Sequence, residues 1–135
     1  MPGAEGRVIH VRALEMRPRS KLEDFGGYRK ALELFDVIVA DLTPFGRHPV
    51  CAGLVRQQVD AADSICANLE EGYGRGSKKE FIHIIRIARG SAREVLGRCD
   101  GFRHWLRAEA VVGQSSLANE VVAILSRSLK TLESR

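Results

Sequence analysis

Apolar and polar residues recur along this chain with a helical period, and the pattern predicts four helices. The first apolar stripe runs from Tyr28 to Leu42 at intervals of three and four residues, which is typical of an amphipathic helix. Thr43-Pro44 ends it, because a residue before proline is disfavoured in the α region. Gly26-Gly27 makes its beginning weak.

Two longer stripes follow. A second helix is predicted from Pro49, a residue that suits a first helical turn, to Glu71. The third is predicted from Lys78 to about Ala108. Gly90-Ser91 lies in the middle of the third helix, where glycine costs about 1 kcal/mol of helix propensity. We expect a close helix crossing at that point to compensate.

The last part of the chain predicts a loop over 109–115 and a fourth helix, with Ser116 as its N-cap and an inward stripe that ends at Leu132. No segment has the alternating pattern of a strand. Four helices with short links predict an all-α fold, an antiparallel up-down-up-down four-helix bundle over residues 25–135. Residues 1–24 mix Gly, Pro and Arg without a sustained period and predict a loosely ordered N-terminal tail.

A bend between the second and third helices organises this fold. Gly72, Gly74 and Gly76 are predicted to supply positive φ angles that end one helix and reverse the chain. Ser77 then begins the next helix as an N-cap, with Glu80 at the spacing of a capping box. Because no strand precedes these glycines, they are not a nucleotide-binding fingerprint.

Composition narrows the class of protein. The 135 residues fit one domain. No apolar run is long enough to span a membrane, and Val8–Arg12 is too short and charged for a signal-peptide core, so a cytoplasmic location is expected. Cys51, Cys66 and Cys99 lack metal-ligand spacing and are interpreted as reduced, buried thiols.

The net charge of +4 is concentrated on the predicted third helix, where residues 77–109 contain eight Lys or Arg against four acids. Their spacing places several cations on one helix face, which predicts a surface for polyanions. Its candidate residues are Arg75, Lys78, Lys79, Arg86, Arg89 and Arg93. The alternative is a solvated face, with some arginines paired across a subunit interface to Asp36, Asp41, Asp60 or Asp63. No aromatic residue interleaves with the cations, which disfavours stacking of single strands.

Other polar residues give weaker signals for a catalytic or metal site. Glu71 and Glu94 could form a catalytic acid pair, but no nucleophile accompanies them, so we favour structural hydrogen bonds for these acids and Asn68. Glu80 and His83 have the E-x-x-H spacing of a di-iron bundle, which needs two such motifs. Only one is present, so we predict no metal, no cofactor and no catalytic residue.

Several short motifs resemble the four-helix-bundle proteins of the 23S rRNA intervening-sequence family, over about residues 22–133. They are Ser64-Ile65-x-x-Asn68, Glu71-Gly72-x-Gly74-Arg75-x-Ser77, Glu80-Phe81 and Ile87-Ala88-Arg89-Gly90-Ser91-x-x-Glu94. The resemblance implies a bacterial protein, a bundle and a homopentameric ring. It also implies a distant similarity to the accessory variability determinant proteins of diversity-generating retroelements, which engage nucleic acid and a reverse transcriptase. The chain departs from the family pattern at Glu70, at Gly26-Gly27 and before Lys21.

Taken together, these patterns predict a non-enzymatic, self-associating bundle that binds RNA or DNA through the basic face of its third helix. One alternative is an interaction scaffold with no nucleic-acid role, whose basic residues lie at subunit contacts. The other is a metal-binding bundle.

Overall fold

The computed structural model describes residues 21–73 and 76–135, and within these ranges the chain is helical and contains no strand. The all-α prediction is confirmed. The α-helices are α3 (Lys21–Asp24), α4 (Gly26–Leu42), α5 (Ala52–Tyr73), α6 (Lys78–Cys99) and α7 (Ala108–Glu133), with two short 3₁₀ helices, η1 (Thr43–Phe45) and η2 (Asp100–His104).

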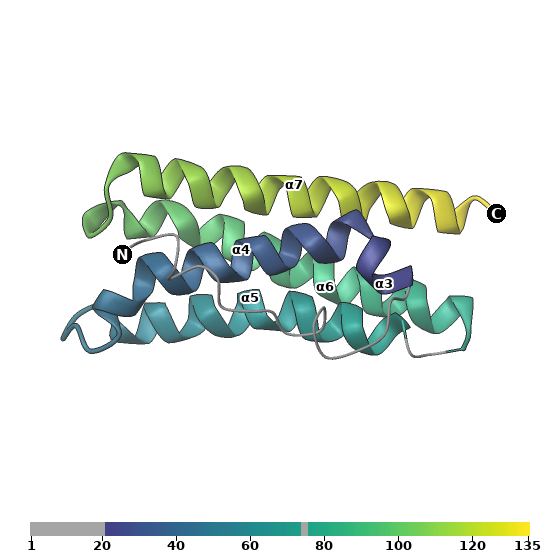
Figure 1. Ribbon diagram of the computed structural model, residues 1–135, viewed down its shortest axis with the longest axis horizontal. Helices are drawn as coiled ribbons and strands as arrows, with labels where there is room; N and C mark the ends of the chain where they lie inside the picture. Colours follow the sequence, from purple (N-terminus) through teal and green to yellow (C-terminus); the bar gives the residue numbers. More distant parts are fainter. Residues whose placement is uncertain (1–20, 74–75) are drawn as a thin grey trace.

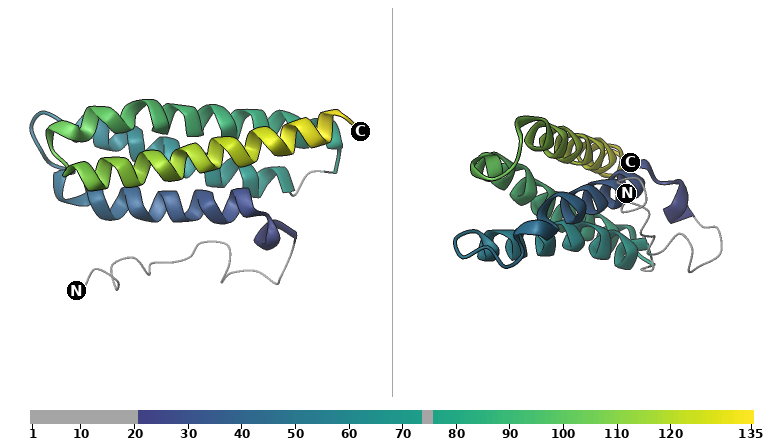
Figure 2. Two further views of the ribbon diagram at one scale, coloured as in Figure 1. Left: turned by 90° about the horizontal axis from the view of Figure 1, so that it is seen from above. Right: turned by 60° about the vertical axis from the view of Figure 1, so that its left-hand side comes forward.

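The four long helices lie side by side, and their direction alternates along the chain (Figures 1 and 2). Each packs against the next in sequence, and α4 also packs against α7. We call the end that holds η1 and η2 the loop end. The other, which holds α3, the α5–α6 connection and the C-terminus, is the turn end (Figure 1).

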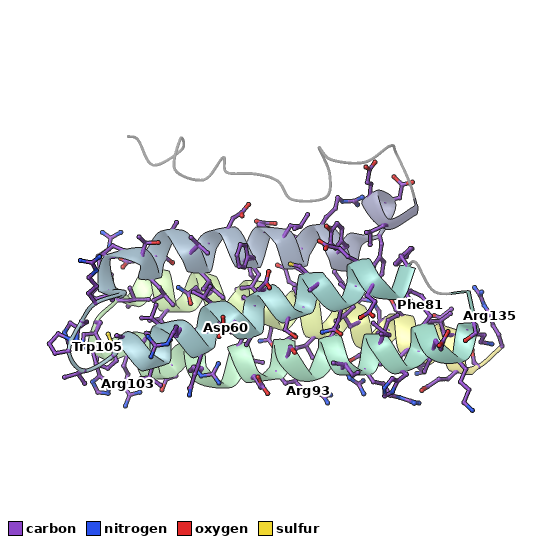
Figure 3. The ribbon with its side chains drawn as sticks, turned by 90° about the horizontal axis from the view of Figure 1, so that it is seen from below. Asp60, Phe81, Arg93, Arg103, Trp105 and Arg135 are labelled. Carbon is purple, nitrogen blue, oxygen red and sulfur yellow. The ribbon has the colours of Figure 1, made fainter. Side chains whose placement is uncertain are left out.

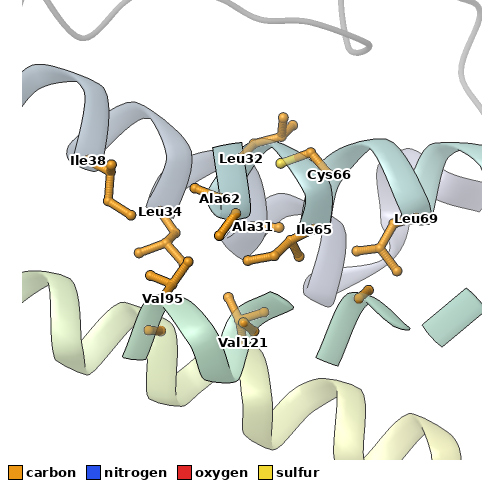
Figure 4. Packing of buried hydrophobic residues seen from close by; sticks show 14 of the residues in the cluster. Ala31, Leu32, Leu34, Ile38, Ala62, Ile65, Cys66, Leu69, Val95 and Val121 are labelled. Carbon is orange, nitrogen blue, oxygen red and sulfur yellow. The ribbon is translucent and has the colours of Figure 1, made fainter. Parts of the chain in front are cut away.

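The core follows the predicted stripes. Large apolar side chains from all four long helices are fully buried and interdigitate along the bundle axis (Figure 4). Burial of this apolar area is the main stabilising term for such a fold. The buried set includes Tyr28, Leu34, Ile38, Leu42, Ile65, Leu69, Ile85, Val95, Phe102, Val121 and Leu125.

The predicted boundary between the third and fourth helices is wrong. α6 ends at Cys99 rather than Ala108, and α7 begins at Ala108, so the predicted loop over 109–115 is helical and Ser116 is not an N-cap. The chain leaves α6 in the tighter η2 turn, which keeps Phe102 buried. Trp105 then packs edge-on against Phe102 and His48, with ring centroids 6.3 and 5.8 Å apart. These contacts join the two connections at the loop end.

The predicted bend between α5 and α6 is present, but its glycines act differently from the prediction. Gly72 lies inside α5 and Gly76 precedes α6, and neither has a positive φ; Gly74 lies outside the described residues. Gly72 is needed for close packing instead, since a Cβ there would lie 2.9 Å from Ile84 Cγ2. Ser77 caps α6 as predicted, and its Oγ accepts a hydrogen bond from the Glu80 N–H at 3.0 Å.

The close helix contact predicted at Gly90-Ser91 does not involve Gly90. Gly90 is exposed, and a Cβ there would meet nothing within 4 Å. The contact between α5 and α6 at this level is made by its neighbour Ser91, whose hydroxyl lies 3.1 Å from that of Ser64.

The predicted division into a tail and a bundle at residue 24 stays a prediction, because residues 1–20 lie outside the described ranges. The structure adds one detail about the boundary. Residues 21–24 form α3, and Leu22 from this helix is buried in the core. Arg29 ties α3 to α4 through a hydrogen bond of 2.8 Å from its guanidinium to the Glu23 carbonyl.

A buried polar layer near the loop end links all four long helices. The Gln58 amide of α5 donates to the Val95 carbonyl of α6 at 3.0 Å and accepts from Arg98 at 2.8 Å. The Gln114 amide of α7 donates to Asp41 of α4 at 3.0 Å. Gln58 and Gln114 are 0% and 1% exposed, so these bonds replace those that water would supply.

The cysteine prediction is confirmed, since Cys51, Cys66 and Cys99 are free and buried. Cys99 lies within the polar layer, and its Sγ is 3.7 Å from the Gln58 amide nitrogen. Burial raises the pKa of this thiol, which keeps it in the protonated, unreactive form.

Glu70 accepts a hydrogen bond of 2.6 Å from the hydroxyl of the fully buried Tyr28. This bond joins α5 to α4.

We expect Tyr28→Phe to lower the free energy of unfolding by about 1.5 kcal/mol, because a charge-assisted bond is lost and the ring is kept. Urea denaturation followed by circular dichroism measures the loss. The exposed pair Lys30 and Glu120 gives the control, since Glu120→Gln removes only a solvent-screened ion pair and should leave the urea midpoint nearly unchanged.

Candidate functional site

The predicted basic residues lie on α6 and at its start. Lys78, Lys79, Arg86 and Arg93 are exposed and Arg89 is half-buried, while Arg75 lies outside the described residues. Lys79, Arg86 and Arg93 are seven residues apart, which places them on one face at intervals of about 10 Å along the helix. Figure 3 shows Arg93 on the outer edge of α6, away from the core. We call this face, from Lys78 to Arg93, the basic face.

The C-terminal part of α7 borders the basic face. Arg86 forms an ion pair with Glu133, and Arg89 donates a hydrogen bond of 3.3 Å to the Ser126 hydroxyl. Lys78 donates to the Arg135 carbonyl at 3.1 Å. These contacts hold the side chains of Lys78, Arg86 and Arg89 against the C-terminal part of the chain. Arg93 projects outward from α6, away from the core. The face therefore combines anchored cations near the turn end with a projecting one at mid-helix.

A pocket of about 620 Å³ opens on the basic face at the turn end. Its described lining consists of Lys78, Lys79, Ile82, His83, Arg86 and Glu133. Three of these side chains carry a positive charge at neutral pH and one carries a negative charge, so the pocket has a net positive potential. Lys78 and Lys79 also occupy the first turn of α6, where the positive end of the helix dipole favours an anion.

The alternative placed some of these arginines against acids across a subunit interface. One of those acids, Asp41, accepts the amide hydrogen bond of Gln114 within the chain. Asp60 is exposed on α5, and Figure 3 shows it on a different helix from Arg93. Such pairing between copies stays a prediction.

The motif residues between α5 and α6 form a structural corner. The Asn68 amide donates to the Ser64 carbonyl at 2.7 Å and to its hydroxyl at 3.0 Å. The Ser64 hydroxyl in turn contacts that of Ser91 at 3.1 Å. This chain of bonds fixes the register of α5 against α6, which agrees with the structural interpretation of Asn68.

The same register separates the two acids proposed as a catalytic pair. Glu71 lies seven residues from Ser64 towards the turn end, and Glu94 lies three residues from Ser91 towards the loop end. Since the two serines are in contact, the acids are about 15 Å apart along the bundle axis. Both are exposed. A shared acid–base role for Glu71 and Glu94 is therefore excluded by geometry.

The E-x-x-H spacing does not assemble into a larger ligand set in the part of the chain that the structure describes. Glu80 belongs to the cap of α6, and His83 is exposed in the basic pocket. Across residues 21–73 and 76–135, no three His, Cys, Asp or Glu side chains group in a way that could hold a metal ion. Within those ranges, moreover, no helix has the length and apolarity that crossing a bilayer requires.

Sequence reasoning missed Ile82, His83 and Glu133 as parts of the basic pocket. The first two could have been found, because they lie one turn from both Lys79 and Arg86 on the same face. Glu133 had no sequence signal, since only the packing of α7 against α6 brings it to Arg86.

A family model described as 23S rRNA-intervening sequence protein matches residues 23–102, which covers α4, α5 and α6 together with the second half of α3. A search of curated proteins found no match.

Proposed function

Because this chain belongs to the 23S rRNA-intervening sequence protein family, we propose that it is a non-catalytic, self-associating helical bundle that binds nucleic acid. The proposal places the phosphate backbone against the basic face of α6. The observation that carries it is the pocket of about 620 Å³ in which Lys78, Lys79 and Arg86 converge. Contacts of this kind position a strand and carry little sequence preference.

Two features support the self-association in this proposal. Ile87 and Val112 are large apolar side chains that are 41% and 65% exposed. Gly90 leaves open space on the outer surface of α6. Exposed apolar groups on a small bundle suit contact with a second copy. The homopentameric ring is included in the proposal on the strength of the family resemblance. Arg75 is included because it lies three residues before Lys78 in the sequence.

We expect nucleic-acid binding to weaken steeply with salt. If the six predicted cations each neutralise a phosphate, log K should fall against log salt with a slope of roughly −4 to −5. The double variant Lys79→Gln/Arg93→Gln should weaken binding about tenfold and reduce the steepness of the slope by about 2. Fluorescence anisotropy with a labelled RNA duplex, from 50 to 300 mM salt, measures both quantities.

A matched control removes the same charge elsewhere. Arg47→Gln/Arg56→Gln changes two exposed arginines near the loop end, so its affinity should stay within about twofold of the wild type. Equal losses in both double variants, or a flat salt response of the wild type, would refute the assigned face.

The second candidate function is an interaction scaffold whose basic residues lie at subunit contacts. It predicts that Arg89→Glu/Arg93→Glu changes the oligomeric mass in light scattering coupled to size-exclusion chromatography. Nucleic-acid binding through the face predicts an unchanged mass and lost binding. One preparation of this variant therefore separates the two functions.

A further inference from the structure

A second pocket, of about 440 Å³, lies at the turn end between the four long helices. Phe25 at the start of α4, Tyr73 at the end of α5 and Phe81 of α6 line one side, and α7 lines the other. Figure 3 shows Phe81 at this end of the bundle. The volume lies in the range of small-molecule sites, which are mostly apolar with a few placed polar groups.

The three aromatic side chains form a continuous wall. The Tyr73 ring lies 5.8 Å from the Phe25 ring and 4.9 Å from the Phe81 ring, the latter edge-on. Burial raises the pKa of the Tyr73 phenol, as expected beside a water-poor surface. Such a wall offers ring faces and edges to a flat apolar body.

Two glycines give this wall its shape. A Cβ at Gly27 would lie 2.7 Å from the Phe25 ring, and a Cβ at Gly72 would lie 3.2 Å from the Phe81 ring. A side chain at either position would displace a ring that lines the pocket. Both glycines lie within helices, where glycine is a poor former. The chain thus keeps the rings in place at the expense of local helix propensity.

The α7 side of the pocket supplies the polar groups. Arg127, Ser128 and Thr131 line it, and their spacing places them on neighbouring positions of one helix surface. None of the described lining residues is acidic. Across the pocket from the aromatic wall, the α7 side therefore presents one guanidinium and two hydroxyl groups. These groups are suited to binding a carboxylate, sulfonate or phosphate.

We propose that this pocket binds a small aromatic anion, with its flat ring against Phe25, Tyr73 and Phe81 and its charged group on Arg127. The site is separate from the basic face, since the two pockets share no lining residue. The proposal is thus independent of nucleic-acid binding.

The test compares two dyes that share an aromatic body and differ in charge. Anilinonaphthalenesulfonate is the anion and N-phenylnaphthylamine is its neutral analogue. Fluorescence titration of the wild type should show saturable binding of both dyes, with one site per chain. Arg127→Gln should weaken the anionic dye about tenfold and leave the neutral dye within about twofold, because only the charge-assisted contact is lost.

Two further variants fix the location. Lys130→Gln removes the same charge from α7 outside the pocket lining, and should leave both dyes unaffected. Ser128→Phe should block both dyes by filling the pocket, with far-UV circular dichroism used to confirm the fold. Absence of saturable binding, equal losses from Arg127→Gln and Lys130→Gln, or a parallel loss of both dyes in Arg127→Gln would each overturn the site.

Discussion

Gly72→Val is expected to destabilise the bundle by about 3 kcal/mol, because it overpacks the contact between α5 and α6. A Cβ at this position would lie 2.9 Å from Ile84 Cγ2 and 3.3 Å from Ile84 Cβ. These atoms are close to the α6 backbone and cannot swing away as the end of a long side chain could. Ile84 and its neighbour Ile85 are buried, so the helices must move apart to relieve the clash. Chemical denaturation monitored at 222 nm gives the free energy of unfolding.

Gly90→Ala is the matched control, since it changes another helical glycine of the motif region. Nothing lies within 4 Å of a Cβ at Gly90. Alanine should therefore stabilise the folded chain by about 1 kcal/mol through helix propensity alone. Opposite signs for the two glycines are the expected result. Stabilisation by Gly72→Val would show that α5 and α6 do not pack closely at this point.

Gln58→Ala is expected to cost about 3 kcal/mol, because it removes buried hydrogen bonds and leaves a cavity. The Gln58 amide contacts the Val95 carbonyl, the Cys99 thiol and the Arg98 guanidinium. Truncation leaves Arg98 without its inward acceptor. The loss is measured as a shift in the urea midpoint at unchanged slope.

The neighbouring Gln57 provides the control for this substitution. It is exposed on the same helix, so Gln57→Ala should change stability by less than about 0.5 kcal/mol. Gln58→Leu keeps most of the volume and separates the two contributions, with an expected cost of about 1.5 kcal/mol from the hydrogen bonds. A cost for Gln58→Ala no larger than that for Gln57→Ala would contradict a structural role for the polar layer.

The helices themselves could be predicted from the sequence because apolar periodicity reports directly on burial. Tyr28 to Leu42 and Ser77 with Glu80 carry local signals that need no tertiary information, and the structure has both elements. The end of α6 could not be predicted in this way. Phe102 stays buried in a 3₁₀ turn, so the apolar stripe continues past the point where the α-helix stops. Gly101 was the available stop signal.

Buried glutamines were missed for a different reason. Gln58 follows Val55 by three residues and precedes Ala62 and Ile65 on the same stripe, so its position indicated the core while its amide suggested the surface. Gln114 has the same relation to Ala118 and Val121. Position on the stripe was the better guide, because a buried amide is tolerated when facing helices supply its partners.

Of the two candidate sites, one could be predicted from the sequence and the other could not. The basic face could be predicted because its cations lie on a single helix, where spacing determines direction. The aromatic pocket could not, because it joins Phe25 to Arg127 across more than a hundred residues and four helices. The only local sequence feature connected with the pocket is the pair Gly27 and Gly72. From the sequence alone these glycines indicate only poor helix formation.

The burial of Cys51, Cys66 and Cys99 has a practical consequence. A thiol reagent such as Ellman's reagent can reach these sulfur atoms only when the helices separate, so its reaction rate under native conditions reports the opening of the bundle. A cysteine introduced on the surface would react ahead of all three. Site-specific probes can therefore be attached to this protein without first removing its natural thiols.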